Sequence, residues 1–398
     1  IFLDDANLPA FDKAQMEGRL ERPLGAGSAY ALGIFFAIVF FVFGGRLWQI
    51  QIADGERYAE RANANTLEST PIFAERGNIL DRNNEPLAWN APPLTHEEFL
   101  ERRYTELIGL AHIVGFVKYP SKDTSGFYIR EDFSGAAGAE SEYNEMLSGT
   151  NGSRTTERNV QGGVVSESVV DLPERGADIR LSVDARLSEA LYGFLMERIR
   201  AVGFEGGAAA IVDVSNGEVV ALTSAPEYSP QALADGAPRG RIEEFIADSR
   251  KPFLPRAAAG LYAPGSVVKP LLAAAALQED IITPEQKILS TGSISIPNPY
   301  DQSRTSVFND WKAHGFVDMR HALAVSSDVY FYEIGGGFEE QKGLGIARIE
   351  KYLREFGFGE MLADPMLGGA DGVVPSPEWK KSAFPSDPWR IGDTYNTS

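Results

Sequence analysis

The sequence contains no cysteine among its 398 residues. This absence excludes disulfide bonds, thiolate metal ligands and a cysteine nucleophile. It suits a cytosolic protein, and equally an exported protein that avoids free thiols in an oxidising compartment. The cellular compartment therefore has to be inferred from other features of the chain.

Positive charge is in deficit, because 37 Lys and Arg stand against 56 Asp and Glu and give a formal net charge of −19. Proteins that bind nucleic acid usually carry a basic surface, and no basic stripe with interleaved aromatic residues occurs here. We therefore expect no nucleic-acid partner. The 43% hydrophobic and 23% charged residues are ordinary for a globular protein, and the length allows two or three domains.

Charged residues are missing altogether from "AYALGIFFAIVFFVFGG", Ala29 to Gly45. Extended to Ile52, this segment reaches roughly 24 residues, or about 36 Å of helix, which is enough to span a bilayer. A buried core helix or a signal peptide would be the alternatives, but the run is long for a signal peptide and no A-x-A cleavage site follows. We predict a cytoplasmic tail over 1–27 and a single transmembrane anchor over 28–52.

The segment "PIFAERGNILDRNNEPLA", residues 71–88, predicts a short strand, a bend and a hairpin whose turn contains Asn83 and Asn84. Residues 91–175 have few long apolar runs, and the stretch "FSGAAGAESEYNEMLSGTNGS" at 133–153 predicts a loop with one short helix. We assign residues 53–175 to a β-rich pedestal, or spacer, domain without catalytic residues.

From Gly176 onward the pattern is α+β. Asp184 is expected to cap a helix with an apolar face formed by Leu187, Leu191, Leu195 and Ile199. Asn216-Gly217 joins two β-rich runs and predicts a hairpin. Further on we expect a loop around Pro297 and Pro299 and a helix over Met319–Val325. An antiparallel sheet flanked by helices, over residues 176–398, follows from this order of elements.

The stretch "LYAPGSVVKP" contains Ser266 and Lys269, three residues apart and on one face if a helix begins at Ser266. A serine hydroxyl becomes a nucleophile when a base removes its proton, and a lysine in a dry environment can be that base. Val267, Val268, Pro270, Leu271 and Leu272 would supply such an environment. Roughly one S-x-x-K spacing is expected by chance in such a chain, so the spacing alone is weak evidence.

A second serine motif follows sixty residues later, where Ser326, Ser327 and Asp328 stand between a predicted helix and an aromatic run. Serine acyl-transfer enzymes with an S-x-x-K motif use such a serine, followed two residues later by a carboxylate or an amide. Ser326 could relay a proton from Lys269 to the leaving group, and Asp328 could hold Lys269 or the substrate. The two motifs together favour a catalytic site.

With these motifs the chain resembles the class B penicillin-binding proteins, which are membrane-anchored D,D-transpeptidases. The resemblance rests on the lone anchor, "RGNILDRNNEPLA", "YAPGSVVKP" and "SSDVYFY". A fifth stretch, "WRIGDTYNTS" at residues 389–398, is similar to the elongation-type members, the penicillin-binding protein 2 kind. The resemblance covers nearly the whole chain and is weakest over residues 91–175.

The resemblance implies a penicillin-binding transpeptidase domain in which Ser266 is the nucleophile, Lys269 its base, and Ser326 and Asp328 the second motif. Tyr262 and Gly265 would border the substrate pocket. The implied substrates are peptidoglycan stem peptides ending in D-Ala-D-Ala, with β-lactam antibiotics as inhibitors and no cofactor or metal. A SEDS-type glycosyltransferase of the RodA kind is the implied partner, in the bacterial inner (cytoplasmic) membrane with the catalytic domain outside.

Three features depart from the family pattern. No lysine is followed by Thr-Gly, so the third motif, K-T-G, is expected in sequence beyond Ser398, in a C-terminally longer chain. Asn84 stands where the family usually has glycine, and the spacer is shorter than in relatives. The oxyanion hole implied by the family would combine the Ser266 N–H with an N–H of the strand that carries K-T-G.

Three other interpretations stay open. Asp310, His314, Asp318 and His321 could hold a metal, although their spacing is not that of an H-E-x-x-H motif. A β-lactam sensor or a β-lactamase would also use S-x-x-K, but neither is expected to combine one anchor with this hairpin. A non-catalytic membrane-anchored scaffold would leave Ser266 and Lys269 without a role.

Overall fold

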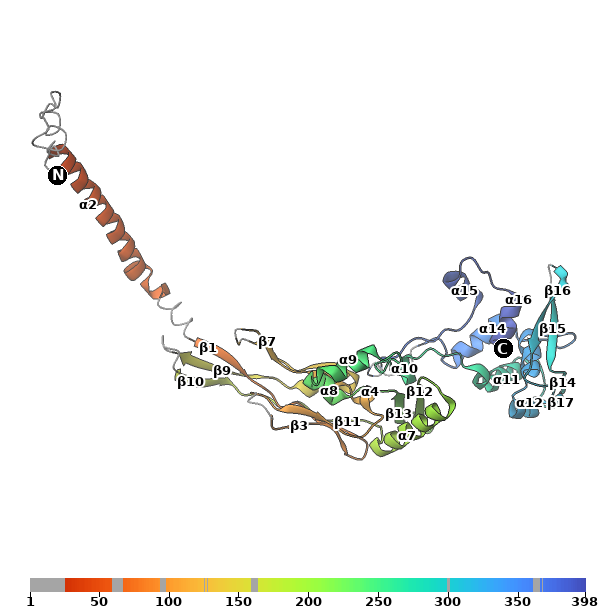
Figure 1. Ribbon diagram of the computed structural model, residues 1–398. Coiled ribbons are helices and arrows are strands. Elements are labelled where there is room, and N and C mark those ends of the chain that lie inside the picture. The colour runs from red at the N-terminus through yellow and green to blue at the C-terminus, as the bar shows by residue number, and fades with distance from the viewer. Residues whose placement is uncertain are drawn as a thin grey trace, which may run out of the picture. The chain divides into compact units, whose positions relative to one another are not determined.

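The computed structural model describes most of the chain and is shown in Figure 1. The described residues are 26–58, 67–93, 98–124, 126, 128–158, 164–298, 301–360, 366 and 368–398. The predicted tail lies outside them except for its last two residues. The chain forms two compact units, the first comprising Ile1–Ile72 with Gly152–Leu172 and the second Phe73–Asn151 with Pro173–Ser398.

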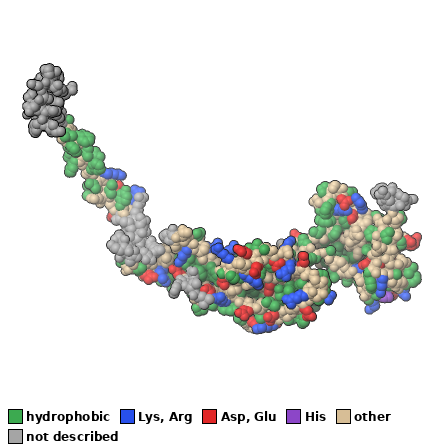
Figure 2. Space-filling model, in the orientation of Figure 1, with side chains coloured by type: hydrophobic (Ala, Val, Ile, Leu, Met, Phe, Trp, Pro, Cys, Tyr) green, Lys and Arg blue, Asp and Glu red, His purple; other side chains and the backbone are tan. Residues whose placement is uncertain are grey.

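The first unit contains the apolar helix. Helix α2 (Ala26–Trp48) continues into the π-helical turn η1 (Gln49–Ala53), and the 24 residues Tyr30–Ala53 are long and apolar enough to cross a membrane. The visible face of α2 is largely covered by hydrophobic side chains (Figure 2). The same unit holds a three-stranded antiparallel sheet in the order β1 (Leu67–Ile72), β9 (Gly152–Arg158), β10 (Val164–Asp171).

The second unit begins with the predicted hairpin. Strands β2 (Ile79–Leu80) and β3 (Pro86–Ala91) pair antiparallel, and Asn84 in the turn has a φ of +66°, a conformation that asparagine tolerates. The four-stranded sheet has the order β11 (Ile179–Arg180), β2, β3, β4 (Glu101–Tyr104). The hairpin predicted from residues 71–88 is therefore confirmed.

Short elements complete this part of the second unit. They are α4 (Ala111–Val114), β5 (Phe116–Lys118), β6 (Ser121–Lys122), β7 (Tyr128–Arg130), β8 (Ser134–Ala137), α5 (Gly138–Glu142) and α6 (Asn144–Ser148). The prediction of a loop with one short helix over 133–153 was wrong, because this stretch forms β8 and two short helices, α5 and α6, divided by a turn at Tyr143.

A buried ionic cluster holds these short elements together. Glu140 on α5 accepts hydrogen bonds from Arg76 Nε and Arg102 Nε, each at 2.7 Å. All three side chains are at most 1% exposed. Asn90 links the two arginines, since its amide donates to the Arg76 carbonyl while its oxygen accepts from Arg102. Such a cluster is stable only while every charge keeps its partner.

The hairpin motif is explained by contacts of Gly77 and Asp81. A Cβ atom on Gly77 would lie 1.8 Å from the carbonyl oxygen of Ala177, so only glycine fits where these two backbones meet. Asp81 is fully buried and accepts hydrogen bonds from the backbone N–H groups of Asn83 and Glu85 at 2.7 and 2.8 Å. It also accepts from the N–H of Ala185, which joins the hairpin to the next helix.

That helix is α7 (Ala185–Val202), capped by Asp184 as predicted, with the carboxylate accepting from Leu187 N at 2.9 Å. The predicted apolar face is only partly correct. Leu187 is 36% exposed, and the buried residues of α7 are Ala185, Ser188, Tyr192 and Ile199. The helix packs mainly on β13, so the buried face lies about one residue away from the leucine stripe.

The hairpin predicted around Asn216-Gly217 is confirmed. Strands β12 (Gly207–Val212) and β13 (Val219–Ala225) pair antiparallel, and Gly217 has a φ of +81°. Three helices follow, which are α8 (Pro230–Asp235), α9 (Arg239–Ala247) and α10 (Arg256–Ala259).

Glu227, just after β13, should make stability depend on pH. Burial raises the pKa of its carboxyl to about 7, although the carboxylate accepts from Gly109 N and Ala111 N at 2.7 and 3.1 Å. The folded state thus binds the proton more tightly, so stability falls as pH rises from about 4.5 to about 7, by roughly 2–3 kcal/mol.

We expect Glu227→Gln to remove this part of the pH dependence. Thermal unfolding of the detergent-solubilised chain between pH 5 and 8 measures it, and the midpoint of the variant should fall less with rising pH. The pKa of Glu333, which burial and Glu339 raise to about 7, leaves a residual slope in both proteins. An unchanged slope in the variant would contradict the assignment.

The last part of the second unit is mainly helical. Its helices are α11 (Lys269–Gln278), α12 (Met319–Val325), α13 (Asp328–Gly336), α14 (Ile346–Glu355), α15 (Pro377–Ala383) and α16 (Ile391–Thr397), and β14 (Ile288–Ser290) pairs with β17 (Gly315–Val317). The helix predicted over Met319–Val325 is confirmed. Helices α11, α13 and α14 share one core that includes Leu272, Phe331 and Ile349.

The loop predicted around Pro297 and Pro299 was wrong for most of its length. Strands β15 (Ser293–Asn298) and β16 (Asp301–Asn309) form an antiparallel hairpin in which Pro297 pairs with Thr305, while Pro299 lies outside the described residues. Ile294 and Ile296 alternate inward, at 3% and 8% exposure, and pack in a cluster with α13 and α16. The alternation of inward and outward residues along β15 therefore indicates the structure better than the proline, which suggested a loop.

Candidate active site

Ser266 lies on a tight turn at the start of α11. The 3₁₀ turn η2 (Gly265–Val268) precedes the helix, so the α-helix starts at Lys269 rather than at Ser266. Gly265 has a φ of +61°, which turns the chain sharply before the serine. Ser266 is exposed and Lys269 is 4% exposed, so the hydroxyl is accessible while the amine is buried beneath it.

The predicted source of this burial was only partly right. Val267 is 71% exposed and Pro270 is exposed, so these neighbours in sequence do not cover the amine. The cover comes from the second motif and from the ring of Phe331, whose centroid lies 5.5 Å from Lys269 Nζ. Phe331 belongs to the aromatic run after Asp328, which is the sequence signal that could have identified it.

One chain of hydrogen bonds joins the two sequence motifs. The Ser326 hydroxyl lies 3.0 Å from the Ser266 hydroxyl and 3.1 Å from Lys269 Nζ. Lys269 Nζ also donates to the Ser326 carbonyl at 3.0 Å and to Asp328 Oδ1 at 2.5 Å. The structure thus brings Ser266, Lys269, Ser326 and Asp328 together, and Ser326 bridges the first serine to the lysine.

The amine of Lys269 is held by three acceptors. A protonated lysine has three N–H donors, and Lys269 has three acceptors within hydrogen-bond distance, two on Ser326 and one on Asp328. The bond to Asp328 pairs two opposite charges. A proton can move from Ser266 through Ser326 to Lys269 only when the amine has a free lone pair.

Ser326 occupies a left-handed conformation, with φ +54° and ψ +46°, at the C-terminal end of α12. Residues other than glycine adopt this conformation rarely, and sites of backbone strain often carry function. The turn points both the carbonyl and the hydroxyl of Ser326 at Lys269. The next residue, Ser327, caps α13 by accepting from the N–H of Tyr330.

A cavity of about 820 Å³ opens beside the two motifs. Its lining includes Tyr262, Gly265, Ser266, Lys269, Asp328, Tyr332, Trp379, Tyr395 and Ser398. Tyr262 is 64% exposed at this cavity, so both residues expected at the pocket border do line it. Helix α16, which carries Tyr395, comes from the stretch that carried the elongation-type resemblance.

Comparisons with protein families identify two domains in the chain. The profile of the penicillin binding protein transpeptidase domain matches residues 207–393, and that of the penicillin-binding protein dimerisation domain matches residues 92–181. Together they cover more than half of the chain. The chain belongs to the penicillin-binding proteins. The predicted family is confirmed, with a dimerisation domain followed by a transpeptidase domain.

Individual relatives place it near penicillin-binding protein 2. Peptidoglycan D,D-transpeptidase MrdA of Haemophilus influenzae is 30% identical over 341 residues, covering 82% of this chain and 49% of the relative. The crystal structure of Pseudomonas aeruginosa PBP2 in complex with WCK 5153 is similar with a TM-score of 0.65 and 31% identity, covering 82% of this chain and 65% of that one.

A third relative is a chain in a solved structure of a peptidoglycan synthase complex that coordinates polymerization and crosslinking. It has a TM-score of 0.64 and 26% identity, and the match covers 94% of this penicillin-binding protein and 74% of that chain. The chain spans about half the length of the curated relatives it matches.

The four residues of the alternative metal site do not converge. Asp318 caps α12 and accepts from His321 N at 2.8 Å, whereas His314 Nε2 lies 3.4 Å from Asp310 Oδ1. Among the described residues, no group of three or more His, Asp or Glu side chains is placed to hold a metal ion. Asp310 instead contacts the second motif, a role that its sequence context did not predict.

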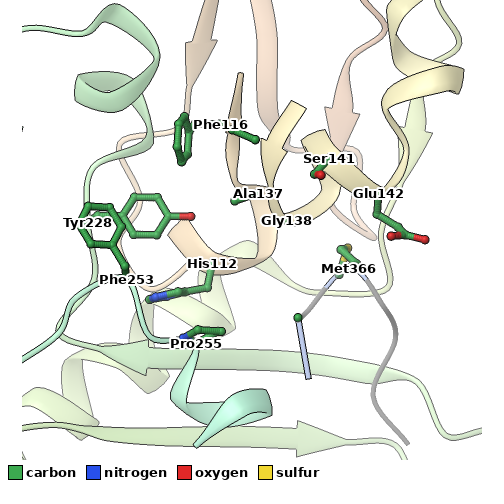
Figure 3. Close-up of a pocket in the computed structure, with 12 residues that line it drawn as sticks. His112, Phe116, Ala137, Gly138, Ser141, Glu142, Tyr228, Phe253, Pro255 and Met366 are labelled. Atoms are coloured by element: carbon green, nitrogen blue, oxygen red, sulfur yellow. The ribbon is translucent and has the colours of Figure 1, made fainter. Parts of the chain in front are cut away.

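A second cavity, of about 430 Å³, lies in another part of the second unit (Figure 3). Tyr228, Phe253 and His112 form one side of it, and Ser141 and Glu142 lie on the other. Burial lowers the pKa of His112 to about 4, so the ring is neutral, and its Nε2 lies 2.9 Å from the Pro252 carbonyl. The cavity beside Ser266, unlike this one, is lined by residues of both serine motifs.

Proposed function

We propose that the protein is a peptidoglycan D,D-transpeptidase that works through a serine acyl-enzyme. The observation that carries the proposal is the continuous hydrogen-bond chain from Ser266 through Ser326 to Lys269 and Asp328. The family membership and the MrdA relatives support the same activity.

In the first step the hydroxyl oxygen of Ser266 attacks the carbonyl carbon of the penultimate D-Ala of a stem peptide. The serine proton passes through Ser326 to the neutral form of Lys269, which acts as the general base. The peptide bond breaks, and the proton returns to the amine of the departing D-Ala. An ester now joins Ser266 to the donor peptide.

In the second step an amine of a neighbouring stem peptide attacks the ester carbonyl. The ester bond breaks, Ser266 recovers a proton from the incoming amine, and a new peptide bond cross-links the two stems. Asp328 keeps Lys269 oriented toward Ser326 in both steps, and Tyr262 and Gly265 border the groove for the donor. A β-lactam would acylate Ser266 in the same way and remain attached.

The location and partner follow from the same proposal. The apolar helix Tyr30–Ala53 would anchor the protein once in the bacterial inner membrane, with the transpeptidase domain outside the cytoplasm, where stem peptides are found. The partner would be a SEDS-type glycosyltransferase of the RodA kind. The likeness to a chain of a peptidoglycan synthase complex that coordinates polymerization and crosslinking supports a partner in wall synthesis.

Release of D-Ala from a stem pentapeptide tests the proposed function. We expect the membrane-embedded product of the complete reading frame to release D-Ala and to form cross-linked dimers when an acceptor amine is present. The Ser266→Ala variant should do neither, because it lacks the attacking oxygen. D-Ala release that is equal in the variant would refute the acyl-enzyme, and a folded, substrate-bound parent that releases none would favour a scaffold.

A further inference from the structure

Asp310 is a buried carboxylate that accepts four hydrogen bonds next to the second motif. It follows β16, and its side chain is 0% exposed. Oδ2 accepts from the Ser327 hydroxyl at 2.9 Å, from Val329 N at 3.0 Å and from the Ser290 hydroxyl at 3.3 Å. Oδ1 accepts from Trp311 N at 2.8 Å.

These contacts lie on the side of the second motif that faces away from Lys269. Ser327 stands between Ser326 and Asp328, and Val329 follows Asp328, so Asp310 holds the Ser327 side chain before Asp328 and the Val329 backbone after it. Ser326 and Asp328 themselves face the other way, toward Lys269. A left-handed residue such as Ser326 persists only where its surroundings impose the conformation.

The surroundings of Asp310 stabilise the negative charge of its carboxylate. Burial alone would raise the pKa of Asp310, but hydrogen bonds from Val329 N and from the Ser327 hydroxyl outweigh it, and the pKa is lowered. A negative charge at the N-terminus of α13, a nine-residue helix, is also favoured by the helix dipole.

We propose that Asp310 is a positioning residue for acyl transfer, which fixes the Ser326–Asp328 turn in register with Lys269. This inference rests on the proposed function of Ser266. Asp310 touches neither Ser266 nor Lys269, so its effect passes through the turn. Without it the left-handed turn relaxes, and the Ser326 hydroxyl no longer bridges Ser266 to the amine.

Asp310→Asn is the variant of choice because it keeps the side-chain volume. The four groups that hydrogen-bond to Asp310 all donate, and His314 Nε2 lies 3.4 Å from Oδ1, so the amide NH₂ of asparagine must face at least one donor. We expect the rate constant for acylation by a fluorescent penicillin, at saturating concentration, to fall by roughly 100-fold. The concentration that gives half of the maximal rate should stay unchanged, because Asp310 itself does not line the cavity.

The matched control is Asp184→Asn, which makes the same substitution in the cap of α7, away from the turn. It should be acylated at the parent's rate. The rate constant of acylation and the final amount of labelled protein together distinguish a positioning defect from a folding defect. A folding defect lowers the final amount of labelled protein but leaves the rate constant of the folded fraction unchanged.

Ser327→Ala provides a second variant if Asp310→Asn does not fold. It removes one donor to Asp310 and should slow acylation by roughly tenfold. If the parent is labelled and the folded variants react at its rate, the positioning role is refuted while the proposed function stands. If the parent itself is not labelled, the proposed function fails and this inference fails with it.

Discussion

Replacing Lys269 by methionine should slow acylation of Ser266 by a fluorescent penicillin by roughly 10²–10⁴-fold, the range that a general base contributes. Methionine is nearly as long as lysine and equally unbranched, but it has no nitrogen to accept the serine proton or to lie over the Phe331 ring. It also leaves the Ser326 carbonyl and Asp328 without their shared donor. Stopped-flow labelling of the detergent-solubilised protein measures the rate.

Lys351→Met is the matched control, because it removes a lysine of α14 that is 56% exposed and paired with Glu355 at 3.8 Å. It should react at the parent's rate. A Lys269→Met protein that is folded and reacts within threefold of the parent, well short of the expected range, would exclude Lys269 as the base. The proton of Ser266 would then need another acceptor.

The second large effect concerns stability. Glu140→Gln should lower the free energy of unfolding by roughly 3–5 kcal/mol, because two buried guanidinium groups lose their counter-charge while staying buried. The variant keeps the volume and the backbone carbonyl that accepts from Arg76. Thermal unfolding followed by circular dichroism would show the loss as a lower midpoint.

Glu142→Gln, two residues further along α5, provides the comparison. Glu142 is exposed, and a surface charge of this kind contributes little. We expect its midpoint to match the parent. Equal midpoints for the two variants would mean that the cluster of Arg76, Arg102 and Glu140 does not support the pedestal.

The parts of the fold that the sequence predicted are those with local signals. An apolar run without charge, an Asn-Gly turn and an aspartate before a helix each act over a few residues, and each was found at the predicted place. The β15–β16 hairpin was missed because Pro297 suggested a loop, while the decisive contacts of Ile294 and Ile296 with α13 and α16 are remote in sequence.

The candidate site shows the same division. The S-x-x-K spacing identified Ser266 and Lys269 as candidates. The second serine motif, which follows it in the chain, added Ser326 and Asp328. The direction of the hydrogen bonds was not predictable, and the bridging position of Ser326 depends on a left-handed turn that no local pattern announces. Asp310 was considered only as a metal ligand, since its contacts with Ser327 and Val329 exist only after folding.

Covalent labelling by a fluorescent penicillin in membranes is the most direct test of the central claim. The complete reading frame is expressed with Ser266 intact and as Ser266→Ala, and both proteins are labelled and separated in denaturing gels. The account predicts a fluorescent band in the parent that is absent from the folded variant. A band of equal intensity in both, or none in a folded parent, would contradict the assignment of Ser266 as the acyl-enzyme nucleophile.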